Sequence, residues 1–191
     1  MGATVKHNQQ RRSSPAVEVI YSGKVFSLER HQITDATGRI DRKDIIRHPG
    51  SAVILPVLDD GKIVLIRQFR VAINTEVWEL PAGTRDPKET FLQTARRELR
   101  EETGYRASTW QKLVEYFPSP GFLNERMAIY LASGLKAGAA APEADEEIST
   151  HPVSVGESLR MIERGSICDS KTLIGILFWQ KFGAGKSRSR K

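Results

Sequence analysis

The sequence predicts a layered α/β protein, and three observations support this prediction. Apolar segments of strand-like composition recur along most of the chain, whereas only a few segments have the spacing of amphipathic helices. Clusters of glycine, proline and aspartate separate these segments. Of the 191 residues, 39% are hydrophobic, which is enough to bury one core of ordinary size. Strands mixed with a few helices favour helices packed against a sheet.

Residues 16–49 are predicted to form a small N-terminal β element. Val17, Val19 and Tyr21 alternate as in a strand, and a turn over 34–38 leads to a second strand over 39–47. Pro49-Gly50 then marks the start of the main domain, residues 50–183. The chain is therefore expected to consist of one small strand element and one larger domain.

The main domain is predicted to open with a hairpin whose strands span 52–58 and 62–70. Asp59-Asp60-Gly61 lies between them and suits a tight turn. A helix is expected over 88–103, because Phe91, Ala95 and Leu99 form an apolar stripe and Gly104 suits a helix C-terminus. The other expected segments are strands over 76–80, 111–117 and 127–132, loops over 82–88 and 135–142, and helices over 155–164 and 169–182.

Composition excludes several classes of protein. No apolar run approaches the roughly 18–20 residues that cross a bilayer, and the first 15 residues lack the apolar middle of a secretory signal. Cys168 is the single cysteine, and the four histidines are scattered, so neither a disulfide framework nor a zinc cluster is expected. We therefore expect a cytoplasmic protein whose metal, if it has one, is held by oxygen ligands, as Mg²⁺ or Mn²⁺ would be.

The net charge of +6 comes from the two ends of the chain. Seven lysines and arginines lie within residues 1–15 and 184–191, so the body between these tails is close to neutral. Both tails are polar, and we expect them to be disordered. Contact of these tails with nucleic acid is the less favoured interpretation, and solvated ends are the preferred one.

Three glutamates mark the chemically informative face of the 88–103 helix. Glu98, Glu101 and Glu102 occupy positions i, i+3 and i+4 and therefore share a face on which their charges repel. A divalent cation would relieve this repulsion, because hard Mg²⁺ prefers carboxylate oxygen. The alternative is a solvated acidic face that pairs with neighbouring arginines, namely Arg96, Arg97 and Arg100.

The glutamates belong to a longer pattern, Gly-x5-Glu-x7-Arg-Glu-(apolar)-x-Glu-Glu-x-Gly-(apolar), which resembles the Nudix box at every position. The matching residues are Gly83, Glu89, Arg97, Glu98, Leu99, Glu101, Glu102, Gly104 and Tyr105. The resemblance implies the Nudix fold, an α/β/α sandwich with a mixed sheet. It implies that two or three Mg²⁺ ions, or Mn²⁺ ions in their place, are bound by the Ala82 carbonyl and by the carboxylates of Glu98, Glu101 and Glu102. Glu101 is also expected to take part in catalysis.

The remaining box residues are expected to have structural roles. The resemblance implies that Glu89 and Arg97 form a pair that braces the box. Gly83 is expected to let the loop turn where a Cβ atom would clash, and Gly104 to end the helix.

Outside the box, the chain resembles ADP-ribose pyrophosphatases. The resemblance is carried by Arg67-Gln68-Phe69-Arg70, by Trp78–Gly83, and by Ser119-Pro120-Gly121-Phe122 followed by Glu125. It implies a homodimer with exchanged N-terminal strands, in which Arg70 contacts the diphosphate and Glu125 the terminal ribose. Phe26 and Arg47 would flank the adenine. The alternative is that Phe26 belongs to the core and Arg47 is a surface charge.

An acidic segment after the 135–142 loop is expected to supply the general base. Related enzymes carry a glutamate here that activates water, and Glu147 is the first candidate and Glu146 the second. The alternative is a solvated run of charge. A mobile loop suits a base that closes over its substrate.

These features predict a Mg²⁺-dependent hydrolase for the diphosphate of a nucleoside diphosphate sugar, with ADP-ribose converted to AMP and ribose 5-phosphate. Hydrolysis of GDP-mannose or another sugar nucleotide is the nearest alternative. A non-catalytic Nudix module that binds a partner is a less favoured third interpretation, because the box is intact.

Overall fold

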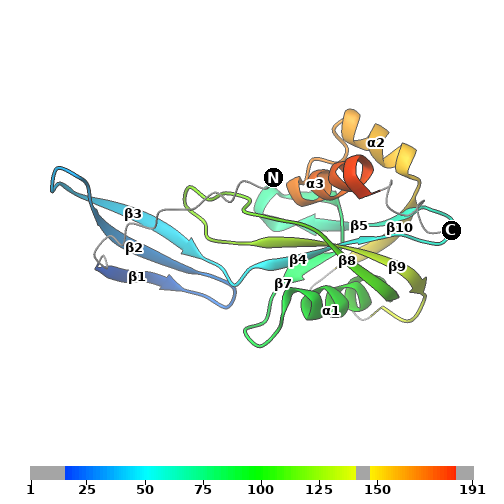
Figure 1. The fold of residues 1–191 in the computed structure, drawn as a ribbon, viewed down its shortest axis with the longest axis horizontal. Helices are drawn as coiled ribbons and strands as arrows, with labels where there is room; N and C mark the ends of the chain where they lie inside the picture. Colours follow the sequence, from blue (N-terminus) through cyan, green and yellow to red (C-terminus); the bar gives the residue numbers. More distant parts are fainter. Residues whose placement is uncertain (1–15, 141–146, 184–191) are drawn as a thin grey trace, which may run out of the picture.

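The computed structural model describes residues 16–140 and 147–183, and its first three strands form a sheet of their own (Figure 1). β1 (Val17–Ser22), β2 (Ser27–Thr34) and β3 (Ile40–Arg47) pair antiparallel in this order. This N-terminal sheet projects from the body of the molecule, and most of its residues are exposed. It is joined to the body at the end of β3, where Ile46 exchanges backbone hydrogen bonds with Phe122 and Asn124.

Two further sheets form the centre of the body. One is mixed, in the order β7-β4-β9-β8, with β4 parallel to β9 and the other pairs antiparallel. The other is antiparallel, in the order β10-β5-β6. All six residues of β4 are buried, which matches their apolar sequence. The strands are β4 (Ser51–Pro56), β5 (Ile63–Arg70), β6 (Thr75–Glu79), β7 (Ala82–Thr84), β8 (Arg106–Tyr116), β9 (Met127–Lys136) and β10 (Ile148–Val153).

Helices cover these sheets from both sides, which confirms the predicted α/β/α arrangement (Figure 1). On one side α1 (Phe91–Thr103) packs Ala95 and Leu99 against Ala52 and Ile54. On the other side lie α2 (Val155–Glu163) and α3 (Ser170–Phe178), which bury Met161 and Ile176 in the larger core. The short helical turns η1 (Val71–Ile73) and η2 (Trp179–Gly183) complete the described elements.

α1 is delimited by local chemistry at both ends. Thr90 accepts a hydrogen bond from the Gln93 amide, and the Gln93 side chain accepts one from the Thr90 amide, forming a capping box. Gly104 has φ +74° and ends the helix in the left-handed conformation that glycine tolerates. The predicted start at Lys88 was therefore wrong by three residues, because the cap at Thr90 satisfies the first free amides of the helix.

Several other predicted boundaries were also wrong. Residues 82–84 form β7 rather than a loop, because they pair with Ser51–Val53 of the buried β4. Residues 135 and 136 belong to β9, since β8 continues to pair with them. β10 was not predicted. It is an edge strand, which explains how it tolerates Pro152.

No helix in the described part of the chain is both long and apolar enough to cross a membrane.

Candidate active site

The glutamates of α1 lie on the side of the helix that contacts β7. Glu98 and Glu101 both accept hydrogen bonds from Arg97 Nη1, at 2.6 and 3.1 Å. Glu102 is buried, and its carboxylate accepts a hydrogen bond from the Ala82 amide at 3.0 Å. Helical spacing therefore brings Glu98 and Glu102 beside the backbone of β7, and Arg97 joins Glu101 to Glu98.

Gly83 is required by a close approach rather than by a turn. A Cβ atom added there would lie 1.9 Å from Glu98 Oε1 and 2.0 Å from Glu98 Cδ. Gly83 is not among the glycines with positive φ, so any side chain could adopt its backbone conformation. The glycine lets the Glu98 carboxylate pack against the β7 backbone.

The donor set of the three glutamates fits a hard divalent cation, because it consists of carboxylate oxygens on one helix face. Glu98 and Glu102 both lie against the backbone of residues 82–83, where the Ala82 carbonyl could add a neutral ligand. Within residues 16–140 and 147–183, no three acidic, histidine or cysteine side chains converge as a preformed metal cluster. Joint binding of one ion by all three glutamates therefore requires their side chains to turn toward one another.

Arg97 connects the helix with the loop before it. Its Nε and Nη2 donate to the two carboxylate oxygens of Glu89 at 3.0 and 3.1 Å, and Nη2 also donates to the Thr84 carbonyl. The hydrogen bond with Arg97 is the largest influence on Glu89 and lowers its pKa against the opposing effect of burial, and the bond from Thr94 adds a smaller lowering. Arg97 thus brings Glu89 together with the acidic face of α1.

Arg70 lies at the end of β5 in a network that sequence reasoning missed. Its Nε and Nη2 donate to Glu79 at 2.7 and 2.6 Å, and the buried Lys171 pairs with the same carboxylate. Glu79 precedes Ala82 by three residues, and the Ala82 amide donates to Glu102, so this network adjoins the acidic face of α1 through the backbone of residues 79–82. The sequence contained one indication of Glu79, because it is a charged residue among the apolar residues at the end of β6. Lys171 gave no signal in the sequence.

Glu125 is held by the segment that enters β4. Ser51 Oγ donates to Glu125 Oε1 at 2.6 Å, and His48 Nδ1 lies 3.5 Å from the same oxygen. His48 is also fixed, because its amide donates to the Asn124 side chain and its Nδ1 accepts from the Gly50 amide. The sequence indicated Glu125 but gave no indication of Ser51 or His48, which reach it from about 75 residues away.

Phe26 and Arg47 lie together on the N-terminal sheet, since Ser27 pairs with Arg47. Phe26 is 42% exposed and packs on Tyr21, so its alternative interpretation as a core residue is wrong. Arg47 forms an ion pair with Glu29 at 2.7 Å. Arg47 ends β3 and Phe26 directly precedes β2, so both belong to the N-terminal sheet.

Of the two candidates for the general base, Glu147 lies among the described residues. Glu146 lies outside the described residues. Glu147 is exposed and directly precedes Ile148, which pairs with Gln68 near the end of β5. The start of β10, which Glu147 precedes, and Arg70 therefore lie at the same end of the β10-β5-β6 sheet.

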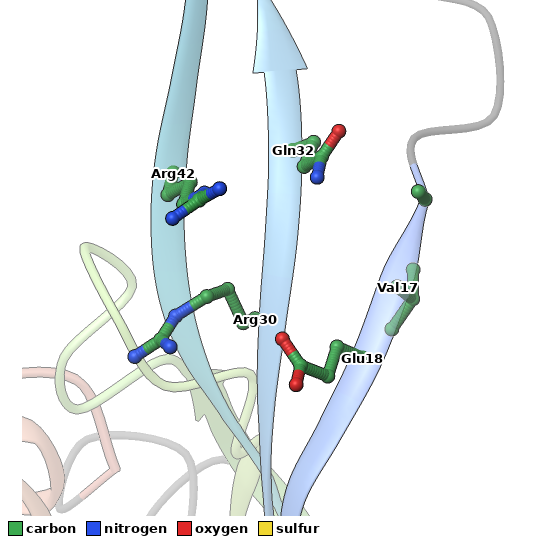
Figure 2. Close-up of a pocket in the computed structure, with 6 residues that line it drawn as sticks. Val17, Glu18, Arg30, Gln32 and Arg42 are labelled. Atoms are coloured by element: carbon green, nitrogen blue, oxygen red, sulfur yellow. The ribbon is translucent and has the colours of Figure 1, made fainter.

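A hollow of 170 Å³ lies away from these residues, on the N-terminal sheet (Figure 2). Figure 2 shows Arg30, Gln32 and Arg42 on β2 and β3, with Glu18 on β1 facing Arg30. Arg30 is already paired with Asp44 through two hydrogen bonds. All the lining residues come from residues 16–42, so the hollow does not contain the box residues.

The geometry of the α1 carboxylates agrees with a family match over most of the chain. Residues 47–165 match the NUDIX domain model, and this range contains the helix, the loop before it, the strand β5 that carries Arg70 and the segment between β8 and β9 that carries Glu125. The chain belongs to the Nudix family. The prediction of a Nudix hydrolase is therefore confirmed, and hydrolases of this family use a divalent metal ion such as Mg²⁺.

Individual relatives extend this match beyond the domain. The chain is 35% identical to the ADP-ribose pyrophosphatase of Bacillus subtilis (strain 168), over 86% of this chain and 90% of the relative. It is 32% identical to the GDP-mannose pyrophosphatase of Cronobacter sakazakii, over 83% and 92% respectively. A crystal structure of an ADP compounds hydrolase shares the fold with a TM-score of 0.79 at 20% identity, covering 92% of this chain and 97% of the other.

Proposed function

We propose that this Nudix hydrolase cleaves the diphosphate of ADP-ribose, giving AMP and ribose 5-phosphate. The observation that carries the proposal is the packing of the Glu98 and Glu102 carboxylates against the β7 backbone, with Arg70 bound to Glu79 at the end of the preceding strand. An acidic face beside an arginine suits a substrate whose phosphates bind both a cation and a guanidinium. The similarity to the ADP-ribose pyrophosphatase of Bacillus subtilis supports the choice of ADP-ribose.

Glu98, Glu101, Glu102 and the Ala82 carbonyl would hold two or three Mg²⁺ ions, and Mn²⁺ could replace them. When bound, these ions would screen the diphosphate and lower the pKa of a water molecule. The protein contributes the spacing of the carboxylates on α1 and the space that Gly83 leaves for Glu98. Arg97 orients this face, because it bonds both Glu98 and Glu101.

Arg70 and Glu125 are proposed to position the two ends of the substrate. Arg70 would donate to the diphosphate oxygens, which a planar guanidinium binds well. Glu125 would accept hydrogen bonds from the terminal ribose, because its carboxylate is oriented by Ser51 and His48. Glu147, or Glu146 in its place, would take the proton from the attacking water.

Glutamine substitution tests the proposed base directly. We expect Glu147→Gln to lower kcat by about 100-fold or more, with KM changed little, because a general base contributes to the transition state and not to substrate binding. Glu146→Gln, made in parallel, should then keep most of the turnover. The reverse ranking would assign the base to Glu146, and two active variants would exclude this segment from the chemistry.

A homodimer is proposed for the N-terminal sheet. This sheet and the turn after β1 expose apolar side chains at Val17, Val19, Ile20, Tyr21, Phe26 and Ile40, and contiguous exposed apolar side chains mark a surface that contacts another protein. Exchange of these strands with a partner chain would cover them. It would also carry Phe26 and Arg47 to the partner's adenine site.

A substrate panel with Mg²⁺ decides between the candidate activities. ADP-ribose, GDP-mannose and ADP-glucose are incubated with the enzyme, and the products are identified by chromatography. The proposal expects the highest kcat/KM for ADP-ribose, with AMP and ribose 5-phosphate as products. Preference for GDP-mannose would favour the second candidate, which the Cronobacter sakazakii relative supports. Absence of turnover on all three would favour a binding role.

A cytoplasmic location is proposed because the single cysteine, Cys168, is free.

A further inference from the structure

A buried network of charges joins the ends of two strands to the start of α3. Glu79, at the end of β6, is 2% exposed and accepts two hydrogen bonds from Arg70, at the end of β5. Lys171, in the first turn of α3, is 8% exposed and pairs with the same Glu79 oxygen, Oε2. Charged side chains are seldom buried to this extent unless they are paired.

Lys171 is fixed on a rigid support. Its Nζ lies 3.1 Å from Asp169 Oδ1, and Asp169 in turn caps α3 by accepting hydrogen bonds from the amide and hydroxyl of Thr172. The Thr172 hydroxyl also accepts a hydrogen bond from the Leu80 amide at 2.8 Å. Leu80 lies between β6 and β7, so the ammonium group is anchored to the strand end that carries Glu79.

Lys171 is a second cation beside Glu79, and it therefore affects how Glu79 holds Arg70. Burial raises the pKa of Glu79, but the hydrogen bonds and charges of Arg70 and Lys171 outweigh this effect and hold it below its ordinary value. Glu79 is therefore an anion with two positive partners. Lys171 also pairs with Asp169, so the charges of Arg70, Lys171, Glu79 and Asp169 balance one another, and the effect of Lys171 on Arg70 is to hold the Glu79 carboxylate in place.

The geometry leaves part of Arg70 available. Nε and Nη2 are engaged by Glu79, whereas Nη1 lies outside this pair. The Arg70 side chain is 39% exposed. A guanidinium held along one edge has few rotamers left, so its remaining edge is preorganised for an incoming anion.

We propose that Lys171 is a positioning residue that acts on the diphosphate through Glu79 and Arg70. This inference rests on the proposed function, in which Arg70 contacts the diphosphate. Lys171 keeps the Glu79 carboxylate in place, so that Arg70 is held by Nε and Nη2 and presents Nη1 to the substrate. Lys171 itself does not touch the substrate.

A double-mutant cycle separates positioning from general support of the fold. Lys171→Met is expected to lower kcat/KM for ADP-ribose by about tenfold, mainly through KM, because Arg70 contacts the diphosphate in the ground state as well. In an Arg70→Lys background the same change should cost less than about twofold, since the residue through which it acts is already altered. Lys171→Arg should restore most of the loss. An additive loss in the Arg70→Lys background would overturn the proposal.

A second measurement does not depend on turnover. The Arg70 Nε–H signal is followed by NMR in ¹⁵N-labelled protein and assigned by its loss in Arg70→Lys. We expect it to shift and to exchange faster in Lys171→Met. It should be unchanged in Lys62→Met, a matched loss of positive charge at the exposed hairpin pair with Asp60. An unchanged Arg70 signal in Lys171→Met would refute the proposal. A wild-type enzyme inactive on ADP-ribose would instead refute the proposed function.

Thermal unfolding shows whether the variants are folded before either measurement is interpreted. If Lys171→Met does not fold, Glu79→Gln provides the same test, because it keeps the shape of the side chain and removes the charge that both cations share. The Arg70 signal should then move in Glu79→Gln as well. A folded Glu79→Gln protein with the wild-type Arg70 signal would overturn the proposal.

Discussion

Arg97 shows how a single residue can organise the chemistry of its neighbours. Its guanidinium bonds Glu89 before the helix, and Glu98 and Glu101 on the helix. The resemblance to the Nudix box predicted the pair of Glu89 and Arg97, because both residues are specified positions of the box. The contact with Glu101 follows from the helix geometry, which places residue i+4 beside Arg97, whereas the contact with the adjacent Glu98 is seen only in the structure.

The Glu89–Arg97 pair predicts a pH-dependent contribution to stability. Because Arg97 lowers the pKa of Glu89 below its ordinary value of 4.5, the contribution is present above pH 4.5 and is lost as the pH falls through the lower value. At about pH 7, Glu89→Gln should lower the free energy of unfolding by about 1.5 kcal/mol. Urea denaturation should show this difference shrinking by about pH 3. A difference that stays constant with pH would contradict the account.

At the scale of elements, regular patterns were predictable and pairings were not. The apolar stripe of α1 and the apolar sequence of β4 are local signals, and both elements were predicted. β7 has three residues and no period of its own, so it forms only because β4 pairs with it. Lys171 and Glu79 are 92 residues apart, and only the packing of α3 against the sheet brings them together. The candidate site was therefore predictable where the box specifies it, and incomplete where distant elements meet.

The contact between β7 and α1 predicts that Gly83→Ala lowers activity much more than it lowers thermal stability. The added Cβ would displace only the flexible end of Glu98, so the melting temperature should fall by no more than about 3 °C. Activity should fall by about 10- to 100-fold, because a group that orients the metal-binding face is moved. Gly156→Ala on α2, where the nearest heavy atom is 3.8 Å away, serves as the control. Full activity in Gly83→Ala would exclude the role assigned to Glu98.

At the scale of the whole molecule, the N-terminal sheet is the least covered part of the described structure. Its apolar side chains predict association, and sedimentation should give about twice the chain mass of 21.4 kDa. Val19→Glu places a charge on a residue that is 60% exposed and should give a monomer with much lower activity. Val71→Glu alters a residue that is 83% exposed outside this sheet, and should remain dimeric. A monomeric, fully active wild type would contradict the exchanged-strand dimer.

The central claim is that the acidic face of α1 carries a metal-dependent hydrolysis. Its most direct test is the Mg²⁺-dependent turnover of ADP-ribose by Glu102→Gln, compared with the wild type and with Glu163→Gln, which alters an exposed residue at the end of α2. The account predicts that kcat falls by about 1000-fold or more in Glu102→Gln while the circular dichroism spectrum is unchanged. Glu163→Gln should match the wild type. Near-normal turnover in a folded Glu102→Gln protein would contradict the assignment of this face to metal binding and catalysis.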